Sequence, residues 1–302
     1  MIYTNVLNRG SGAVRRIAND CGEEHPILQT LNRDGDEVSP RAVVVPICQR
    51  MGYRRYRIVG TGFYVTRYGL LATAAHVLTA MVNTRTGLIE DAFVLQEHGE
   101  SSILFRPLVS ASISNVVDVG LVQLETQTAK GIVPPNPRTE LSWSCPADGE
   151  ALVTYAYPQN YELSHEEGAP HPTILCDYIE GSFLEEISAD QRPFIRYPHY
   201  ETSLCVPDGA SGAPVFDPTG RVIGICCRAW DFGEGEQSAT PLSSVVPTTY
   251  LRTIGETAAS PPEHSWEFAQ LPEALKGSRL SFDSLVHYGH VLALTGPAPA
   301  SA

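Results

Sequence analysis

The segment Gly209-Ala210-Ser211-Gly212-Ala213-Pro214 places one serine in a tight loop of small residues. Glycine lets a loop adopt backbone conformations that other residues avoid. Backbone N–H groups around this serine can therefore converge on one point, where they would stabilise the oxyanion that forms in acyl transfer. A serine hydroxyl is a poor nucleophile at neutral pH, so this chemistry also needs a base and an orienting carboxylate elsewhere in the chain.

Two upstream segments supply candidates for those partners. Thr73-Ala74-Ala75-His76-Val77 places a histidine at the end of an apolar strand, and Asp118-Val119-Gly120-Leu121-Val122 places a carboxylate at the start of another. Each segment alone is a weak signal, because a lone histidine is usually structural and Asp is common at strand ends. With Ser211 they form a complete set of nucleophile, base and orienting acid.

Together the three segments resemble the trypsin-like (chymotrypsin-fold) serine peptidase superfamily. The chain order His, Asp, Ser is that of chymotrypsin-like enzymes and differs from that of subtilisins and α/β-hydrolases. Gly60-Thr61-Gly62-Phe63 before the histidine, and Gly220-Arg221-Val222-Ile223-Gly224-Ile225 after the serine, are most similar to the bacterial and intracellular branches. The resemblance covers about residues 42–255 and leaves both termini unexplained.

The resemblance implies a fold, a triad and an activity. The fold is all-β, with two packed six-stranded antiparallel β-barrels and the site in the cleft between them. His76 would act as general base and then general acid, Asp118 would orient it, and Ser211 would be the nucleophile. The N–H groups of Gly209 and Ser211 would form the oxyanion hole. The expected function is a serine endopeptidase that cleaves proteins or peptides through an acyl-enzyme, without cofactor or metal.

The same resemblance locates a primary specificity pocket. Its base lies six residues before the nucleophile, at Cys205, followed by Val206. Its opposite wall lies near Cys227, Arg228 and Ala229. Neither Cys205 nor Val206 supplies the carboxylate that a buried Lys or Arg of a substrate would need. We therefore expect a small apolar pocket that favours an apolar side chain before the cut bond.

Charged neighbours leave alternatives for this pocket. Asp208 and Asp231 could bring a carboxylate inward, and Arg228 could reach an acidic substrate. A glutamate preference commonly uses a histidine on the wall strand, and none occurs between residues 221 and 232.

The chain departs from the digestive enzymes at two positions near the nucleophile. Ala210 replaces the aspartate with which a newly cleaved N-terminus would pair, and Ala213 replaces a glycine. Ile58-Val59-Gly60 superficially resembles an activation site, but it lies within a predicted barrel strand and is interpreted as core. We therefore expect activity without cleavage at Ile58.

Short apolar segments recur at the spacing expected of strands in an all-β protein. They form two groups of six: 42–47, 56–65, 70–73, 91–97, 102–109 and 118–125, then 151–157, 173–180, 194–200, 213–216, 221–228 and 238–245. The predicted division is an irregular N-terminal extension (1–40), a first barrel (41–128), a linker (129–149), a second barrel with a C-terminal helix (150–255), and a partly helical C-terminal extension (256–302). Phe282, Leu285, Val286, Gly289 and Leu292 recur there at helical spacing.

Composition narrows the partners and the compartment. A net charge of −13 disfavours nucleic acid. Seven cysteines without zinc or redox spacing are typical of reduced thiols. No signal peptide is apparent, and no apolar run approaches the ~20 residues that span a membrane. We therefore expect a cytoplasmic protein without membrane contact, with a possible regulatory protein partner at the terminal extensions.

Three alternatives remain. An α/β-hydrolase would need glycine at position 213 and a histidine after the serine. A protease-fold scaffold that binds proteins without cleaving them is the main alternative, although such scaffolds usually lack a triad member. A metal site at His287 and His290, or at His165 and His171, is a weak alternative, because histidines at such spacing are mostly solvated.

Overall fold

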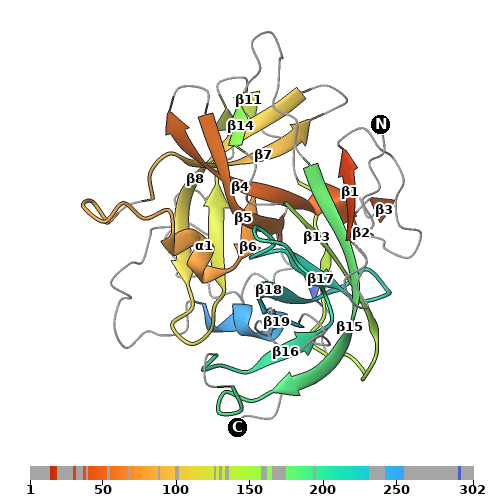
Figure 1. The fold of residues 1–302 in the computed structure, drawn as a ribbon. Coiled ribbons are helices and arrows are strands. Elements are labelled where there is room, and N and C mark those ends of the chain that lie inside the picture. The colour runs from red at the N-terminus through yellow and green to blue at the C-terminus, as the bar shows by residue number, and fades with distance from the viewer. Residues whose placement is uncertain are drawn as a thin grey trace.

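Two barrels make up the computed structural model of this chain (Figure 1). The described residues are 14–18, 30–31, 37–38, 40–52, 55–66, 69–87, 89–98, 102–125, 127–128, 131–132, 136–157, 162–164, 175–192, 195–230, 242–254 and 292–293. Most of them lie in antiparallel strands, and the expected all-β fold of two six-stranded barrels is confirmed.

The first barrel closes on itself through six strands. They are β4 (Val44–Gly52), β5 (Arg55–Tyr64), β6 (Leu70–Thr73), β7 (Ala92–His98), β8 (Ser102–Ile113) and β9 (Gly120–Leu124). The pairing runs β5-β4-β7-β8-β9-β6 and returns from β6 to β5. The short strand β14 (Glu162–Ser164) pairs with β5 on the outside of this ring. Apolar side chains such as Ile47, Phe63 and Val122 fill the interior.

The second barrel closes in the same way. Its strands are β13 (Ala151–Ala156), β15 (Leu175–Ile187), β16 (His199–Thr202), β17 (Pro214–Phe216), β18 (Val222–Trp230) and β19 (Leu242–Pro247). Numbered one to six in chain order, both rings read 1-2-3-6-5-4. The two barrels therefore share one topology, although the sequence shows no internal repeat.

Three short helices occur among the described residues of the two barrels. The 3-10 helix η1 (Pro40–Val43) leads into β4, and α1 (Ala75–Thr79) follows β6. The 3-10 helix η2 (Thr248–Thr253) follows β19. None of the helices in the described part of the chain has the length and hydropathy needed to cross a membrane.

The terminal segments contain strands that the sequence did not predict. Strand β1 (Val14–Ala18) pairs with β15 between Leu175 and Ile179, before β15 begins to pair with β16 at Phe183. An unpaired strand edge exposes N–H and C=O groups, so β1 supplies partners for that part of β15. A further pair is formed by β2 (Thr30–Leu31) and β3 (Glu37–Val38). The N-terminal extension is therefore not wholly irregular.

The linker and the tail also reach the second barrel. Strand β12 (Glu140–Leu141) pairs in parallel with β18, and β20 (Leu292–Ala293) pairs with β12. A small pair of strands, β10 (Gln127–Thr128) and β11 (Gly131–Ile132), precedes them. Leu292, expected on a helical stripe, thus lies in a strand, because β12 offers it a backbone ladder. The other four stripe residues, and the histidines at 165, 171, 287 and 290, lie outside the described residues.

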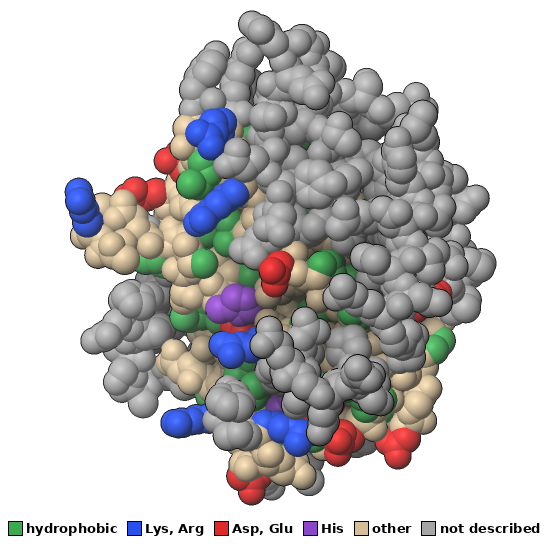
Figure 2. Space-filling model, viewed as in Figure 1, with side chains coloured by type: hydrophobic (Ala, Val, Ile, Leu, Met, Phe, Trp, Pro, Cys, Tyr) green, Lys and Arg blue, Asp and Glu red, His purple; other side chains and the backbone are tan. Residues whose placement is uncertain are grey.

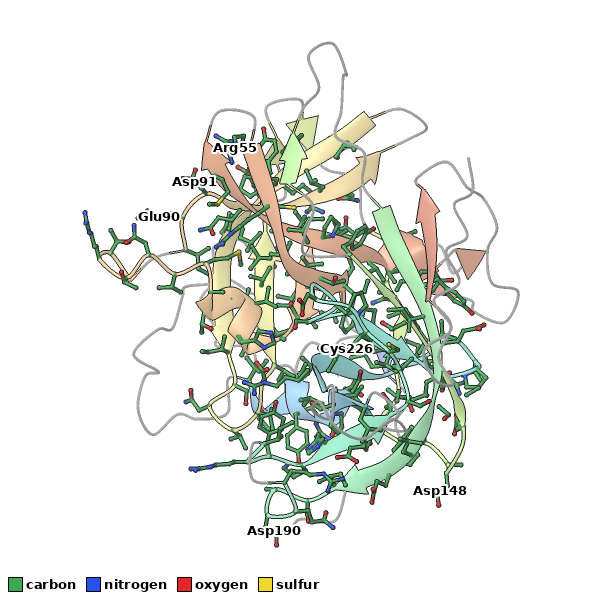
Figure 3. All side chains as sticks on the ribbon, viewed as in Figure 1. Arg55, Glu90, Asp91, Asp148, Asp190 and Cys226 are labelled. Carbon is green, nitrogen blue, oxygen red and sulfur yellow. The ribbon has the colours of Figure 1, made fainter. Side chains whose placement is uncertain are left out.

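Adjacent cysteines on β18 pack on opposite sides of the strand. Cys226 belongs to the core of the second barrel, and Cys227 to the cluster that includes the first-barrel core. Side chains alternate across a strand, so this is the expected arrangement. Figure 3 shows Cys226 deep in the molecule, whereas Asp148 and Asp190 lie at the periphery of the second barrel. The six described cysteines are free thiols.

A buried arginine joins the linker to the first barrel. Arg106 of β8 is only 1% exposed. Its guanidinium donates to the side chains of Tyr64, Gln96 and Asn136 and to the carbonyl of Glu125. Among the described residues its acceptors are neutral groups, whereas a buried cation usually has a carboxylate partner. Asn136 lies in the segment that the sequence analysis assigned to the linker. The network therefore fixes this part of the linker to the first barrel.

Candidate active site

His76 and Asp118 come from two neighbouring connections of the first barrel. His76 is in α1, directly after β6, and Asp118 lies in the bend between β8 and β9. The ring atom Nδ1 of His76 is 2.6 Å from Oδ2 of Asp118, and the backbone N–H of His76 donates to Oδ1 at 2.9 Å. A carboxylate accepts hydrogen bonds, so Nδ1 carries the proton of this contact and Nε2 is the ring nitrogen that remains for the proton of Ser211.

Burial and hydrogen bonding act in opposite directions on Asp118. Burial alone would raise the pKa of its carboxyl group. Hydrogen bonds from the ring and backbone of His76, with the charges of His76 and Arg228, outweigh burial and hold that pKa below its usual value. The side chain of Asp118 is 14% exposed and that of His76 is 42% exposed. The carboxylate thus stays ionised while the imidazole faces the solvent side.

The loop before Ser211 adopts a turn that requires glycine. The N–H of Ala210 donates to the carbonyl of Pro207 at 3.1 Å, and Gly209 has a φ of +97°. A positive φ at the third residue defines a type II turn, for which glycine is favoured. The sequence prediction attributed the same conformational freedom to the glycines around Ser211.

Two N–H groups of this loop have no hydrogen-bond acceptor among the described residues. Gly212 and Ala213 donate to the carbonyls of Cys226 and Ala210. In the described part of the chain, no acceptor takes the N–H of Gly209 or of Ser211. Gly209 is buried and Ser211 is half-buried, where backbone donors are usually paired, so these two N–H groups are available for a group bound in the cleft. Such donors can stabilise an oxyanion.

The hydroxyl of Ser211 and the ring of His76 open onto the same cleft. This cleft has a volume of about 300 Å³ and is lined by both residues and by Gly209. The Ser211 hydroxyl donates to the carbonyl of Cys227 at 3.3 Å, and no hydrogen bond joins it to His76 among the described residues. Contacts of this kind are often loose without substrate and tighten in the complex.

The cleft contains most of the predicted pocket residues. Val206, Cys227, Arg228 and Ala229 line it. Cys205, expected at the base, is half-buried but is not among the lining residues.

The sequence interpretation did not single out the first-barrel wall of the cleft, which consists of Val59, Val77 and Ala80. Val59 directly precedes Gly60-Thr61-Gly62-Phe63, and Val77 directly follows His76. Apolar residues that flank two recognisable motifs are the signal that could have identified this wall.

Charges of both signs border the cleft. Asp208 and Arg228 are exposed lining residues. In the described part of the chain, Arg228 forms no ion pair with a carboxylate. Figure 2 shows basic and acidic side chains interspersed with hydrophobic ones on the described part of this face. The described residues contain no cluster of three or more metal-ligating side chains.

A comparison with sequence models of protein families identifies the family of this chain. The sequence model of the family described as "Trypsin-like peptidase domain" matches residues 60–225, more than half of the chain. A comparison with curated protein sequences found no significant match.

Several solved structures are similar to this chain. A mutant of Rv3671c from M. tuberculosis H37Rv in its inactive form is 18% identical, with 69% of this chain and 82% of that chain covered and a TM-score of 0.43. The serine endoprotease from Yersinia pestis is 18% identical, with 68% and 59% covered and a TM-score of 0.44. The HtrA-type protease AlgW with a tripeptide is 16% identical, with 68% and 56% covered and a TM-score of 0.45. The chain spans less than two thirds of the last two. The family match, which includes both His76 and Ser211, carries the conclusion: this chain belongs to the trypsin-like peptidase family.

Proposed function

We propose that the chain is a serine endopeptidase whose triad is His76, Asp118 and Ser211. The observation that carries the proposal is the convergence of His76 and Ser211, from different barrels, on the cleft that also contains Gly209. Asp118 holds the histidine through both carboxylate oxygens. Nucleophilic catalysis by serine needs this combination of base, orienting acid and oxyanion donors.

The proposed reaction runs through an acyl-enzyme. The Ser211 hydroxyl turns from the Cys227 carbonyl towards His76, whose Nε2 takes its proton as Oγ attacks the substrate carbonyl carbon. The N–H groups of Gly209 and Ser211 hold the resulting oxyanion. The imidazolium then gives its proton to the leaving amine as the C–N bond breaks. Water, deprotonated by His76, attacks the acyl-enzyme, which releases the acid and restores Ser211.

An unpaired strand edge favours an extended peptide as the substrate. Strand β18 pairs with β19 as far as Trp230, but with β17 only as far as Ile225. On its β17 side, the part from Cys227 to Trp230 has no strand partner in the described part of the chain. Extended peptides add to such edges through backbone hydrogen bonds. Because Cys227, Arg228 and Ala229 also line the cleft, we propose that this edge and Val206 contact the residues before the cut bond.

Activation at Ile58 would be incompatible with the first barrel. Ile58 lies within β5 and is 1% exposed. A cut before it would divide the strand that pairs with both β4 and β6. With Ala210 before the nucleophile, no carboxylate stands at that position to pair with a new N-terminus. We infer that the chain is active without this cleavage.

A peptide-library digest with the parent chain and Ser211→Ala tests the proposal. Cleavage by the parent, and its loss in the variant, is the expected result. Reaction of the parent with a fluorophosphonate that labels activated serines should disappear in the same variant. A folded parent chain that neither cleaves nor reacts would instead favour a protein-binding scaffold.

A further inference from the structure

Thr61 of β5 is fully buried and forms hydrogen bonds with segments outside its own strand. Its backbone N–H donates to the carbonyl of Ser211 at 2.8 Å, and its hydroxyl donates to the carbonyl of Gly209 at 2.8 Å. The same hydroxyl accepts the N–H of Tyr157 at 3.0 Å, and the Thr61 carbonyl accepts the hydroxyl of Thr73 at 2.7 Å. One first-barrel residue is thus bonded twice to the loop that carries the nucleophile.

The end of a strand ladder makes this contact possible. Strand β6 pairs with β5 only at Phe63 and Tyr64. The N–H and C=O of Thr61 are therefore left for the loop and for Thr73. Glycines allow the backbones to meet: a Cβ on Gly212 would lie 2.1 Å from the Thr61 carbonyl oxygen, and a Cβ on Gly60 would lie 2.9 Å from the Ser211 carbonyl oxygen.

The two carbonyls that Thr61 holds alternate with the two free N–H groups along the loop. The Gly209 carbonyl belongs to the peptide unit before Ala210, and the Ser211 carbonyl belongs to the unit before Gly212. The N–H of Ser211 belongs to the unit between these two. Peptide units are planar and have only two soft torsions at each residue. Fixing both flanking planes therefore restricts the direction in which the N–H of Ser211 points.

We propose that Thr61 is a positioning residue of the oxyanion hole, an inference that rests on the proposed peptidase function. The Gly209–Ala210 unit is held at both ends, because its carbonyl accepts the Thr61 hydroxyl and its N–H donates to Pro207. This unit follows the N–H of Gly209 and precedes that of Ser211. The hydroxyl of Thr61 acts on the reaction through these donors and does not touch the substrate.

Thr61→Val tests the proposal, because valine keeps the shape and the backbone N–H but removes the hydroxyl. Removing a whole oxyanion donor costs about 100-fold or more in kcat, so misplacing one should cost about tenfold or more. KM should stay within about twofold, because the oxyanion exists only in the transition state. Affinity for a peptidyl boronate, which mimics that state, should fall by the same factor as kcat.

A matched control separates positioning from stability. Thr248 is also fully buried, and its hydroxyl donates to the carbonyls of Ser142 and Ile223, neither of which lines the cleft. Thr248→Val should lower the thermal midpoint and leave kcat unchanged. The pair Thr61→Ser and Thr61→Cys compares a strong and a weak donor of similar size, in case valine prevents folding. The serine variant should keep most of the kcat that the cysteine variant loses.

The outcomes separate this inference from the proposed function. Two results would overturn the inference: equal kcat in Thr61→Ser and Thr61→Cys, or parental kcat in a folded Thr61→Val whose thermal midpoint is lowered. Either result would mean that Thr61 contributes to stability and does not position the oxyanion donors. Neither result bears on the nucleophile. A parent chain that fails to react with fluorophosphonate, or Ser211→Ala that still cleaves, would refute the function itself and the inference with it.

Discussion

The two barrels share one strand order, yet equivalent connections contribute different chemistry. The connection between the third and fourth strands holds His76 of α1 in the first barrel and Ser211 in the second. Asp118 comes from the connection between the fifth and sixth strands of the first barrel. The shared topology thus determines where the connections meet, and the local sequence of each connection determines what it can do.

The groups that the two connections present are also oriented in different ways. The first presents a side chain, whose orientation is set by two hydrogen bonds to Asp118. The second presents, besides the Ser211 hydroxyl, backbone groups whose directions depend on the positive φ angles of Gly209 and Gly212. Truncating the catalytic side chain should therefore disable either connection, whereas adding a single methyl group to a glycine should disable the second.

Removing either triad side chain should have the largest effect on catalysis. We expect Ser211→Ala and His76→Ala each to lower kcat by about 10⁴-fold or more, while far-UV circular dichroism and the thermal midpoint stay near those of the parent. The double variant should be hardly slower than either single variant, because the triad acts as a unit. Cleavage rates of one peptide substrate measure this. Substantial activity in a folded His76→Ala would contradict the comparison.

Adding a methyl group at Gly212 should disrupt the second connection. Gly212 has a φ of +88°, and its Cβ would lie 2.1 Å from the Thr61 carbonyl oxygen and from the Thr73 hydroxyl. Gly87, in a surface turn, has a φ of +69° but nothing within 4 Å of a Cβ. Gly87→Ala should cost only the backbone strain, about 1–2 kcal/mol. Gly212→Ala should destabilise the chain by more than about 3 kcal/mol, or remove activity.

Urea unfolding of both glycine variants measures that difference. Equal losses of stability would mean that the nucleophile loop does not depend on close backbone contact with β5.

The sequence predicted the barrels well because each strand has a local signature. Each of the twelve barrel strands overlaps a segment expected from apolar periodicity, and the motif around Ser211 carries its own turn requirement. The pairing of β1 with β15 and of β20 with β12 is different, since a two-residue or five-residue strand is defined by a distant partner. Thr61 lies in the quoted segment Gly60-Thr61-Gly62-Phe63, but the sequence does not reveal the role proposed for it, because that role depends on hydrogen bonds to residues about 150 positions away. The direction of the Ser211 hydroxyl is a rotamer choice, which sequence does not encode locally.

Introducing a carboxylate into the cleft should change the substrate preference. The expected factor is smaller than the losses of kcat expected for the triad variants. Val206 lines the cleft and is 9% exposed, so Val206→Asp would place a charge where the parent has an apolar wall. We expect the ratio of kcat/KM for Lys or Arg over an apolar residue before the cut bond to rise about tenfold or more. Val109→Asp, the same change at an exposed site on β8, should leave the ratio unchanged.

Fluorogenic peptides that differ only at this position measure the ratio. A parent chain that already prefers Lys, Arg or Glu would reject the apolar pocket.

The smallest expected effect concerns acid stability and isolates the first-barrel connection. The pKa of Asp118 is lowered in the folded state, so the folded chain binds its proton less readily than the unfolded chain does. Stability from this group is present above the unfolded pKa, near the model-compound value of 3.8, and is lost as pH falls through the lower folded value. Asp118→Asn should therefore make the unfolding free energy decline less steeply below about pH 4.

The same change at the exposed Asp190 provides the control. Urea midpoints measured from pH 7 to pH 2 report the slope, and an unchanged slope in Asp118→Asn would mean that the His76–Asp118 pair does not stabilise the fold. In that case the two hydrogen bonds of the pair would serve only to orient the imidazole, and only the second connection would contribute to stability through its close backbone contacts.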